Sequence, residues 1–416
     1  YLSNNQSREF IELGGDGLRD RTLRHLEGLP SLRSLILNSA PNITDGAMAY
    51  LARLSRLEEL KILFTPSITD ARMPFLERMP NLRLLDLHNT SVTDRGLVYL
   101  QALHNLEDLT LPQGRGPRWT VTDVSLGYVA TLPRLRHLNA RGACPIDTSD
   151  PGPFSDEGLR ALSQCRQLES LLINSGTGIS DAGIGHISTL PRLERLGLMC
   201  TGATNEGMAR LGTIASLKDI FLWFPYTDRV TVAGLNELNK LTRLTNAHIT
   251  GIVQDHAGLN LDNLAQLDWL LLDIRGPHPN HHQCLLTDQD LAALARHPRL
   301  KYLGVGISPL VTDAGIAQLG QLKSLERLFV GGEQVTDQGL ASLTGLTDLC
   351  RLTVSGNFTD AGLRQLAALQ WMRHLVITCP GGIPAETEAY LMQKWQIAAQ
   401  RDELERTAAA IELKAR

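Results

Sequence analysis

The stretch LRLLDLHNTSVTDRGLVYLQAL, residues 82–103, decides the fold of this chain. Its first six residues are apolar at positions one, four and six, which predicts a short strand. A tight loop follows, and Leu97, Leu100 and Leu103 then recur at the spacing of a short amphipathic helix. One unit of this chain is therefore a strand, a loop and a helix.

Copies of the strand pattern, leucine-x-x-leucine-x-leucine, recur along the whole chain. They are spaced by about 23–33 residues, most often about 24–25. A degenerate copy, with Ile11 and Leu13 in the fourth and sixth places, precedes the first complete one by one period, so about fifteen strands are predicted. The complete copies begin at Leu32, Leu57, Leu82, Leu106, Leu135, Leu168, Leu193, Leu217, Leu244, Leu267, Leu300, Leu325, Leu349 and Met372.

A Thr-Asp pair marks the start of many predicted helices. The threonine hydroxyl can cap free backbone N–H groups there, and the aspartate just inside the helix opposes the positive end of the helix dipole. A glycine two residues later leaves room for close packing on the neighbouring coil. The pairs are residues 44–45, 69–70, 93–94, 122–123, 312–313, 336–337 and 359–360, and the glycines are Gly96, Gly183, Gly315, Gly339 and Gly362.

These units resemble leucine-rich repeats from end to end of the chain. Helix starts of the form T-D-x-G-L are similar to the short repeats of bacterial members and to the cysteine-containing class found in F-box substrate receptors. That class has Cys or Asn after the strand, where some units of this chain have Thr65, Thr90 and Thr201. The resemblance implies an α/β solenoid, a horseshoe with a parallel sheet on its concave face and short helices on its convex face. It specifies a scaffold and no reaction.

The uninterrupted repeat predicts one elongated solenoid, although 416 residues alone suggest two or three globular domains. Insertions are expected near residues 113–119, 141–153 and 275–286, either as interaction sites or as tolerated surface loops. We expect a partial first repeat over residues 1–31, about fourteen repeats over 32–380, and a capping helix with an extension over 381–416.

The last segment, from Ala385 to Arg416, reads as one helix without the repeat motif. Its first half is expected to cover the apolar end of the last repeat, because an open solenoid end exposes its core. The second half, from Arg401, is charged and rich in alanine. Three alternatives are open for this second half. It extends into solvent as a free helix end or linker, it joins a partner helix, or it leads into a further domain.

Charge and cysteine usage narrow the classes of partner and compartment. Lys+Arg 40 against Asp+Glu 44 gives a net charge of −4, which disfavours generic binding to nucleic acid or to an anionic membrane. No stretch is long and apolar enough to insert in a bilayer. The six cysteines form no C-x-x-C pair, which indicates free thiols in a reducing compartment and a cytoplasmic location.

The chain begins at Tyr1, inside a partial repeat and without Met. We therefore expect that a segment upstream, with its targeting information, is absent from this sequence. The alternative to a cytoplasmic location is that the protein is translocated into a host cell.

The third, fifth and seventh residues of each strand pattern should share the inner face of the sheet, because side chains alternate along a strand. Only 5% of the residues are aromatic, yet several should gather there from Leu217 onward. Aromatic residues and arginine are typical of interface hot spots. The predicted partner-binding residues are Phe221, Trp223, Trp269, Leu271, Tyr302, Arg327, Phe329 and Arg351. The alternative is that these aromatics pack on one another or under the third insertion and only complete the fold.

The third insertion contains candidate metal ligands, since imidazole and thiolate are ligands of zinc. They are His278, His281, His282 and Cys284. However, His281 and His282 are adjacent and point apart in most backbone conformations, and no second ligand pair follows. A polar, histidine-rich loop is the favoured interpretation, and we predict no metal and no cofactor.

The sequence favours a binding module over an enzyme. It contains no G-x-S-x-G elbow, P-loop, H-E-x-x-H motif or dinucleotide fingerprint. We expect a partner protein of unknown identity on the inner sheet face, with the chain acting as the recognition arm of a larger effector or scaffold. The resemblance also suggests the substrate-recognition part of an F-box-type ubiquitin ligase or a secreted bacterial effector. The alternative of another class is a metal-dependent protein or enzyme built on the histidine-rich insertion.

Overall fold

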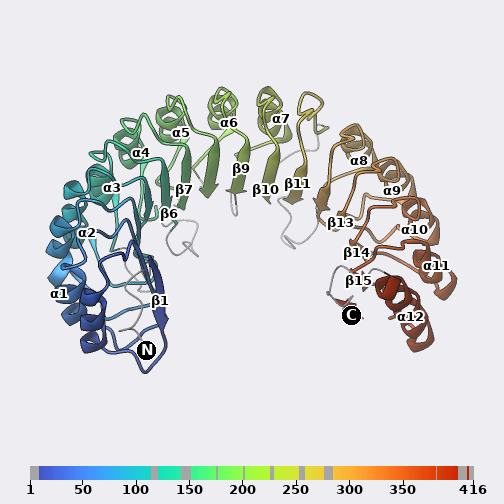
Figure 1. Ribbon diagram of the computed structural model, residues 1–416. Coiled ribbons are helices and arrows are strands. Elements are labelled where there is room, and N and C mark those ends of the chain that lie inside the picture. Colours follow the sequence, from blue (N-terminus) through green and yellow to red (C-terminus); the bar gives the residue numbers. More distant parts are fainter. Residues whose placement is uncertain are drawn as a thin grey trace. The chain divides into compact units, whose positions relative to one another are not determined.

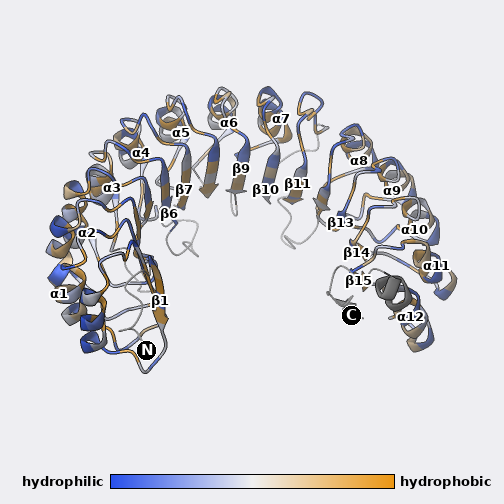
Figure 2. Cartoon of the chain, viewed as in Figure 1, coloured by the Kyte–Doolittle hydropathy of each residue, from blue (hydrophilic) through white to orange (hydrophobic). Residues whose placement is uncertain are grey.

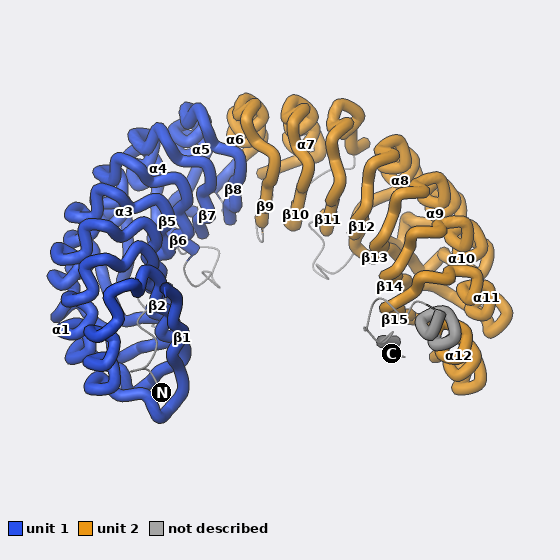
Figure 3. The backbone as a smooth tube through the Cα atoms, viewed as in Figure 1, with its two compact units in different colours: residues 1–203 blue, residues 204–416 orange. Residues whose placement is uncertain are grey.

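The computed structural model describes residues 9–113, 120–141, 151–174, 177–199, 202–224, 229–252, 258–275, 284–380, 382–401 and 410–411. The chain divides into two compact units, residues 1–203 (unit 1) and residues 204–416 (unit 2), which Figure 3 shows in different colours. Each unit is a stack of coils that contain a strand, a loop and usually a helix (Figure 1).

In the described part of unit 1, the strands pair in chain order and each is parallel to the next. This order follows from the repeat, because each coil returns the chain to the same edge of the sheet one strand further along. The strands are β1 (Phe10–Gly14), β2 (Ser34–Asn38), β3 (Glu59–Leu63), β4 (Leu84–Asp86), β5 (Asp108–Thr110), β6 (His137–Ala140), β7 (Ser170–Asn174) and β8 (Arg195–Met199).

In unit 1 the chain passes from the end of one strand to the start of the next through short helices, which lie on one side of the sheet (Figure 1). Several are 3₁₀ helices, labelled η, and η3 contains Pro74, which lacks the N–H that an α-helix would need there. The helices are η1 (Asp20–Gly28), η2 (Asp45–Ala47), α1 (Met48–Leu51), η3 (Asp70–Arg78), α2 (Asp94–Leu97), η4 (Val98–Ala102), α3 (Asp123–Val129), α4 (Asp156–Leu162) and α5 (Asp181–Ile187).

Unit 2 repeats this arrangement, again with parallel strands in chain order among its described residues. Its strands are β9 (Asp219–Phe224), β10 (Asn246–Ile252), β11 (Trp269–Arg275), β12 (Tyr302–Val305), β13 (Arg327–Gly331), β14 (Arg351–Ser355), β15 (His374–Thr378) and β16 (Ala410–Ile411). Its helices are α6 (Asn205–Leu211), α7 (Val232–Asn236), η5 (Glu237–Lys240), α8 (Asp288–Leu294), α9 (Asp313–Leu319), α10 (Asp337–Leu343), α11 (Asp360–Gln365), η6 (Leu366–Ala368) and α12 (Ala385–Arg401).

The strands lie where the sequence pattern placed them. Each of β2–β15 begins at the third residue of its copy, and the residues in the fourth and sixth places are buried in the core. In β2, for example, Leu35 and Leu37 are fully buried, and the residues between and beside them are partly exposed. Hydrophobic and hydrophilic residues are accordingly mixed along the strands (Figure 2). The fifteen predicted strands and the α/β leucine-rich-repeat solenoid are confirmed.

Hydrogen bonds between side chains tie successive coils together near the helix starts. At Thr336 the backbone N–H and the hydroxyl both donate to the carboxylate of Asp313 on the preceding coil, at 2.7 and 2.5 Å. The Thr336 hydroxyl also accepts from the N–H of Gln338 at 3.3 Å, which confirms the predicted helix cap. The same link to the next coil joins Asp20 to Thr44, Asp45 to Thr69, Asp70 to Thr93, Asp94 to Thr122, Asp123 to Ser155, Asp156 to Ser180, Asp288 to Thr312 and Asp337 to Thr359.

The recurring glycine is explained by the same aspartates. A Cβ atom on Gly339 would lie 2.6 Å from Asp313 Oδ1, and one on Gly183 would lie 2.3 Å from Asp156 Oδ1. The N–H of each of these two glycines donates to that oxygen at 2.9 Å. The predicted close packing on the neighbouring coil is therefore confirmed at these positions, and its cause is an approaching carboxylate.

At the C-terminal end of the described chain, α12 packs next to α11 and η6. Leu391 and Trp395 are buried, and Arg364 lies over the ring of Tyr390 at 5.0 Å from its centroid. The prediction of one helix to Arg416 was wrong, because Ala410–Ile411 forms β16 and pairs in parallel with β15.

Most of each predicted insertion lies outside the described residues, namely 114–119, 142–150 and 276–283, as do residues 1–8. Within the described ranges, none of the helices combines the length and the apolar character that spanning a membrane requires.

Candidate functional site

The inner face of unit 2 presents the predicted partner-binding side chains in rows that cross the strands. The inner face is the side of the sheet that the third, fifth and seventh pattern residues occupy. One row runs in register through Asn246, Trp269, Tyr302, Arg327 and Arg351. The next row runs through Phe221, His248, Leu271, Gly304 and Phe329. Residues far apart in sequence are therefore neighbours, as parallel pairing requires.

Four rings from four neighbouring strands contact one another, and we call Phe221, His248, Trp269 and Tyr302 the ring row. The rings of Phe221 and His248 meet edge to face at a centroid distance of 4.4 Å. The rings of His248 and Trp269 are tilted at 5.9 Å, and Trp269 stacks on Tyr302 at 4.5 Å and 10°. All four side chains are partly exposed, so the row is held by its own contacts and still reaches solvent.

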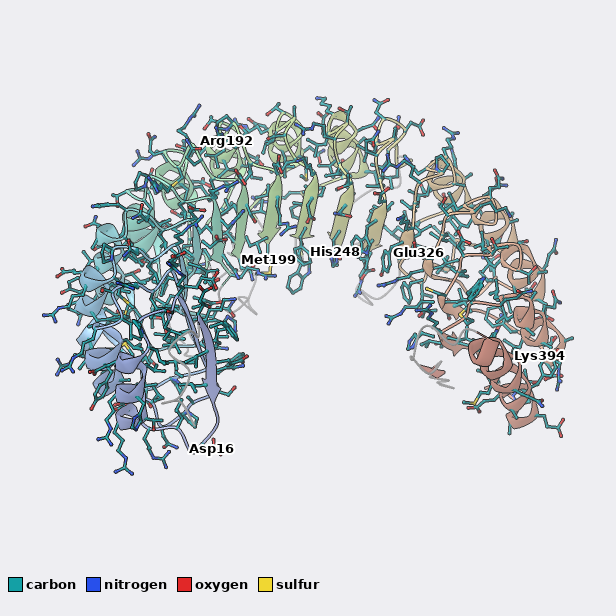
Figure 4. The ribbon with its side chains drawn as sticks, viewed as in Figure 1. Asp16, Arg192, Met199, His248, Glu326 and Lys394 are labelled. Atoms are coloured by element: carbon teal, nitrogen blue, oxygen red, sulfur yellow. The ribbon has the colours of Figure 1, made fainter. Side chains whose placement is uncertain are left out.

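His248 was not among the predicted site residues, although it completes the row between Phe221 and Trp269. Its place in the fifth column of the strand pattern was the available signal. Burial lowers the pKa of His248 below the ordinary value for histidine, and the nearby Asp273 carboxylate opposes this effect. Its Nε2 lies 3.0 Å from the hydroxyl of Thr250, and Figure 4 shows it on the strand side of unit 2.

Gly304 is a second residue that the sequence reasoning missed. A Cβ atom at this position would lie 3.1 Å from the hydroxyl oxygen of Tyr302 and 3.3 Å from Leu271 Cγ. The missing side chain therefore leaves the space over which the Tyr302 ring lies. Burial raises the pKa of Tyr302, so the phenol stays neutral and can act as a hydrogen-bond donor at physiological pH.

The other predicted residues lie on the same face beside the ring row. Leu271 and Phe329 are partly exposed on either side of Gly304, and Trp223 pairs in register with Thr250. Within the described residues, neither Trp223 nor Phe329 makes a ring contact. The structure thus joins three of the five predicted aromatics through His248 and leaves the other two at the margins.

The third insertion begins beside this face. Asp273 accepts hydrogen bonds from Arg275 Nε at 3.0 Å and from Nη2 at 2.5 Å. Cys284 is buried, and its backbone N–H donates to Ile307 at 3.1 Å. Burial raises the pKa of the Cys284 thiol to about 11, which disfavours the thiolate that a metal would need. The other candidate ligands, His278, His281 and His282, lie outside the described residues, and no group of three metal-ligating side chains occurs within them.

The inner face of unit 1 is polar by contrast. A hollow there is lined by Lys61, Asp86, Asp108, Thr110, His137, Asn139 and Ser170, among others. Burial raises the pKa of Asp86, although the backbone N–H of His88 donates to its carboxylate at 2.9 Å. The inner face of unit 1 is therefore a mixed polar surface around this hollow.

Asp108, His137 and Ser170 occupy neighbouring strands in register, an order that suggests a catalytic triad. His137 Nδ1 is hydrogen-bonded to the carboxylate of Asp108, and its Nε2 lies 3.8 Å from Glu169 Oε2. No hydrogen bond joins His137 to Ser170 in the described structure. A triad needs the second nitrogen directed at the hydroxyl, so the three residues lack the arrangement of an activated nucleophile.

Comparison with known proteins supports the leucine-rich-repeat fold and assigns no function. No protein-family model and no curated protein matches the chain. An internalin from Listeria monocytogenes is 24% identical, with a TM-score of 0.58 over 84% of this chain and 88% of that chain. A leucine-rich-repeat protein from Leptospira interrogans is 16% identical, with a TM-score of 0.53 over 98% and 90%. The TLR13–ssRNA13 complex is 16% identical, with a TM-score of 0.57 over 99% of this chain and 54% of that chain.

Proposed function

We propose that this chain is a protein-binding module that docks a partner protein on the inner face of unit 2, around the ring row. The observation that carries the proposal is the stacked pair of Trp269 and Tyr302, whose rings remain partly exposed on the side of the sheet opposite the described repeat helices (Figure 1). Large aromatic side chains in a fixed position lose little entropy on binding and dominate interface energies. The module binds and does no chemistry of its own.

The fold supports this proposal because parallel coils hold the rings on a rigid surface. Phe221, His248 and Trp269 each project from a strand whose neighbours fix it by backbone hydrogen bonds. A preformed surface avoids the ordering cost that a flexible loop would incur on association.

The test is affinity capture from the native lysate with the intact chain and with the double variant Trp269→Ala, Tyr302→Ala. We expect capture to be lost, since hot-spot truncations weaken binding by roughly 2–4 kcal/mol each. Trp371→Ala is the matched control, because Trp371 is 50% exposed and lies in the turn before β15. Unchanged capture by the double variant, with an unchanged melting temperature, would remove the ring row from the proposal.

A finer version is that the module is the recognition arm of a larger effector or scaffold. The T-D-x-G-L starts, such as residues 336–340, support it by their resemblance to bacterial and F-box-type repeats. The sequence of the complete coding region distinguishes an F-box substrate receptor from a secreted bacterial effector, since each carries its own additional segment. An upstream region with neither an effector module nor a secretion signal would contradict both.

The metal-dependent alternative rests on His278, His281 and His282 and has its own test. Elemental analysis of the purified chain after dialysis should find less than stoichiometric zinc. One equivalent of zinc that is lost in a triple His→Ala variant would establish the alternative.

A further inference from the structure

Arginines near the strand starts of unit 1 are neutralised from the neighbouring coil. Arg33 pairs with Glu58, Arg83 with Glu107 at 3.0 Å, and Arg136 with Glu169 at 2.8 Å. Hydrogen bonding to Glu107 raises the pKa of Arg83, as expected for such a pair. In this chain an arginine on one coil therefore commonly meets a carboxylate on the next.

Two arginines on the inner face of unit 2 break this rule. Arg327 and Arg351 are exposed and directly opposite each other on β13 and β14. The guanidinium group of neither residue has a hydrogen bond or an ion pair with any other residue that the structure describes. Like charges directly opposite on adjacent strands are unfavourable, so the chain retains a repulsive pair beside the ring row. A bound anionic group would relieve that repulsion.

We propose that Arg327 and Arg351 bind carboxylate side chains of an acidic peptide segment in the partner, a proposal that rests on the proposed function of the ring row. Tyr302 is in register with Arg327, and Trp269 with Tyr302, so aromatic surface and positive charge adjoin in one row. The segment that fits this row has an apolar residue against Trp269 and Tyr302, followed by Asp or Glu at the arginines. Arginine's planar group of donors suits a carboxylate.

Two observations favour a peptide over a single-stranded nucleic acid. The indole of Trp269 is stacked on Tyr302, so that face is closed to a base, and the His248 ring lies beside the indole with its centroid 5.9 Å away. The arginines in this row of the described strands are only Arg327 and Arg351, whereas a polynucleotide carries a charge on every residue. An RNA arm belongs in the test because the TLR13 structure noted above is a complex with ssRNA13.

The test is selection of twelve-residue peptides from a random phage-displayed library on the intact chain, followed by titration of the synthetic peptides. Four proteins are compared: the unaltered chain, Arg327→Glu with Arg351→Glu, Trp269→Ala with Tyr302→Ala, and a control. The control is Arg192→Glu with Arg243→Glu, which makes the same change in net charge at exposed positions outside the proposed site. Figure 4 shows Arg192 on the helix side of unit 1. Circular dichroism and the milder variant Arg327→Gln with Arg351→Gln check that a loss is not misfolding.

The expected result is enrichment of peptides with Asp or Glu beside an aromatic or leucine residue. Their affinity should fall about tenfold or more in the arginine variant, since hydrogen bonds to charged groups contribute about that factor. It should also fall in the ring variant and at high salt, and stay unchanged in the control.

Each other outcome overturns a defined part. Peptides lost in the ring variant but indifferent to the arginine variant would overturn the acidic-segment proposal and leave the ring row standing. Peptides indifferent to both variants, or no enrichment, would count against the ring row as well. An oligouridine decamer that binds more tightly than the peptides, and is released by the arginine variant, would assign the arginines to nucleic acid.

Discussion

In every Thr-Asp pair except the last, at residues 359–360, the aspartate does more than oppose the helix dipole, because its carboxylate reaches the following coil. Asp313 accepts three hydrogen bonds there, from the N–H and hydroxyl of Thr336 and from the N–H of Gly339. One coil replaces the aspartate with Asn205, whose side chain bonds the N–H and the hydroxyl of Thr231, each at 2.9 Å. The chain thus links successive coils both through a charged carboxylate, as at Asp313, and through a neutral amide, as at Asn205.

We predict that Asp313→Ala lowers the free energy of unfolding by about 1–3 kcal/mol, because the donors of Thr336 and Gly339 lose their acceptor. Asp313→Asn should cost less, since Asn205 shows that an amide can serve the same two threonine groups. Urea unfolding followed by circular dichroism measures both. Equal losses for Ala and Asn would show that the carboxylate charge, and not the hydrogen bonds, is what matters.

Gly339, which packs against this aspartate from the following coil, gives a second prediction. Gly339→Ala should destabilise the protein by about 1–3 kcal/mol, because the new Cβ would lie 2.6 Å from Asp313 Oδ1 and 3.0 Å from Val335 Cγ1. Gly127→Ala is the matched control, since nothing lies within 4 Å of its Cβ position in α3. The control should be neutral or stabilising by up to about 1 kcal/mol. Thermal melting of both variants measures this difference: the melting temperature should fall for Gly339→Ala and stay unchanged or rise for Gly127→Ala.

His297 predicts how stability depends on pH. It is buried, its Nε2 has no hydrogen-bond partner among the described residues, and burial lowers its pKa, opposed by Asp262 and aided by Arg296. As pH falls, His297 in the unfolded chain therefore binds its proton at a higher pH than His297 in the folded chain does. The contribution of His297 is therefore complete above about pH 6.5, the ordinary pKa of histidine, and is lost as pH falls through the lower folded value.

We expect the urea midpoint of the unaltered chain to fall between pH 7.5 and pH 5.5, and His297→Gln to reduce that fall. His248, whose pKa burial also lowers, should supply part of the remainder. A midpoint that rises on acidification, or a fall that His297→Gln leaves unchanged, would contradict the assignment.

Among the elements, α12 follows the last complete coil and lacks the T-D-x-G-L start that many of the repeat helices have. Its residues Leu391 and Trp395 are 0% and 2% exposed, and it lies against α11 and η6. These contacts are what a cap on an open solenoid end would make, although the domain boundaries themselves remain a prediction.

If α12 is the cap, Leu391→Ala with Trp395→Ala should lower the free energy of unfolding by roughly 3–5 kcal/mol or more and expose the last coil to association. Lys394→Ala is the control, since Lys394 is exposed on the same helix (Figure 4). Melting curves and light scattering report the two effects. A double variant that melts and scatters like the control would show that the last coil needs no cover.

The elements were predictable to different degrees, for physical reasons. The strands could be placed to the residue because leucines at fixed spacing must all face one core, as Leu35 and Leu37 do. The end of the chain could not, because charge and alanine content favour a helix locally, whereas β16 forms by pairing with β15, a contact distant in sequence.

At the scale of the whole molecule, the two inner faces have different chemistry. The inner face of unit 1 is polar, with Asp86, Asp108 and His137 around a hollow, and that of unit 2 presents the ring row beside Arg327 and Arg351. The columns of the strand pattern predicted which side chains share a face. They could not predict which rings would touch, because that depends on rotamers and on a gap such as Gly304.

Site-specific photo-crosslinking with benzoylphenylalanine in the intact chain tests most directly whether a partner docks on the inner face of unit 2. One probe replaces Leu271, beside the ring row, and the other replaces Val124, which is 53% exposed on α3. Docking on the inner face of unit 2 predicts that irradiation in native lysate links a discrete partner from position 271 and none from position 124. A partner linked only from position 124 would contradict it.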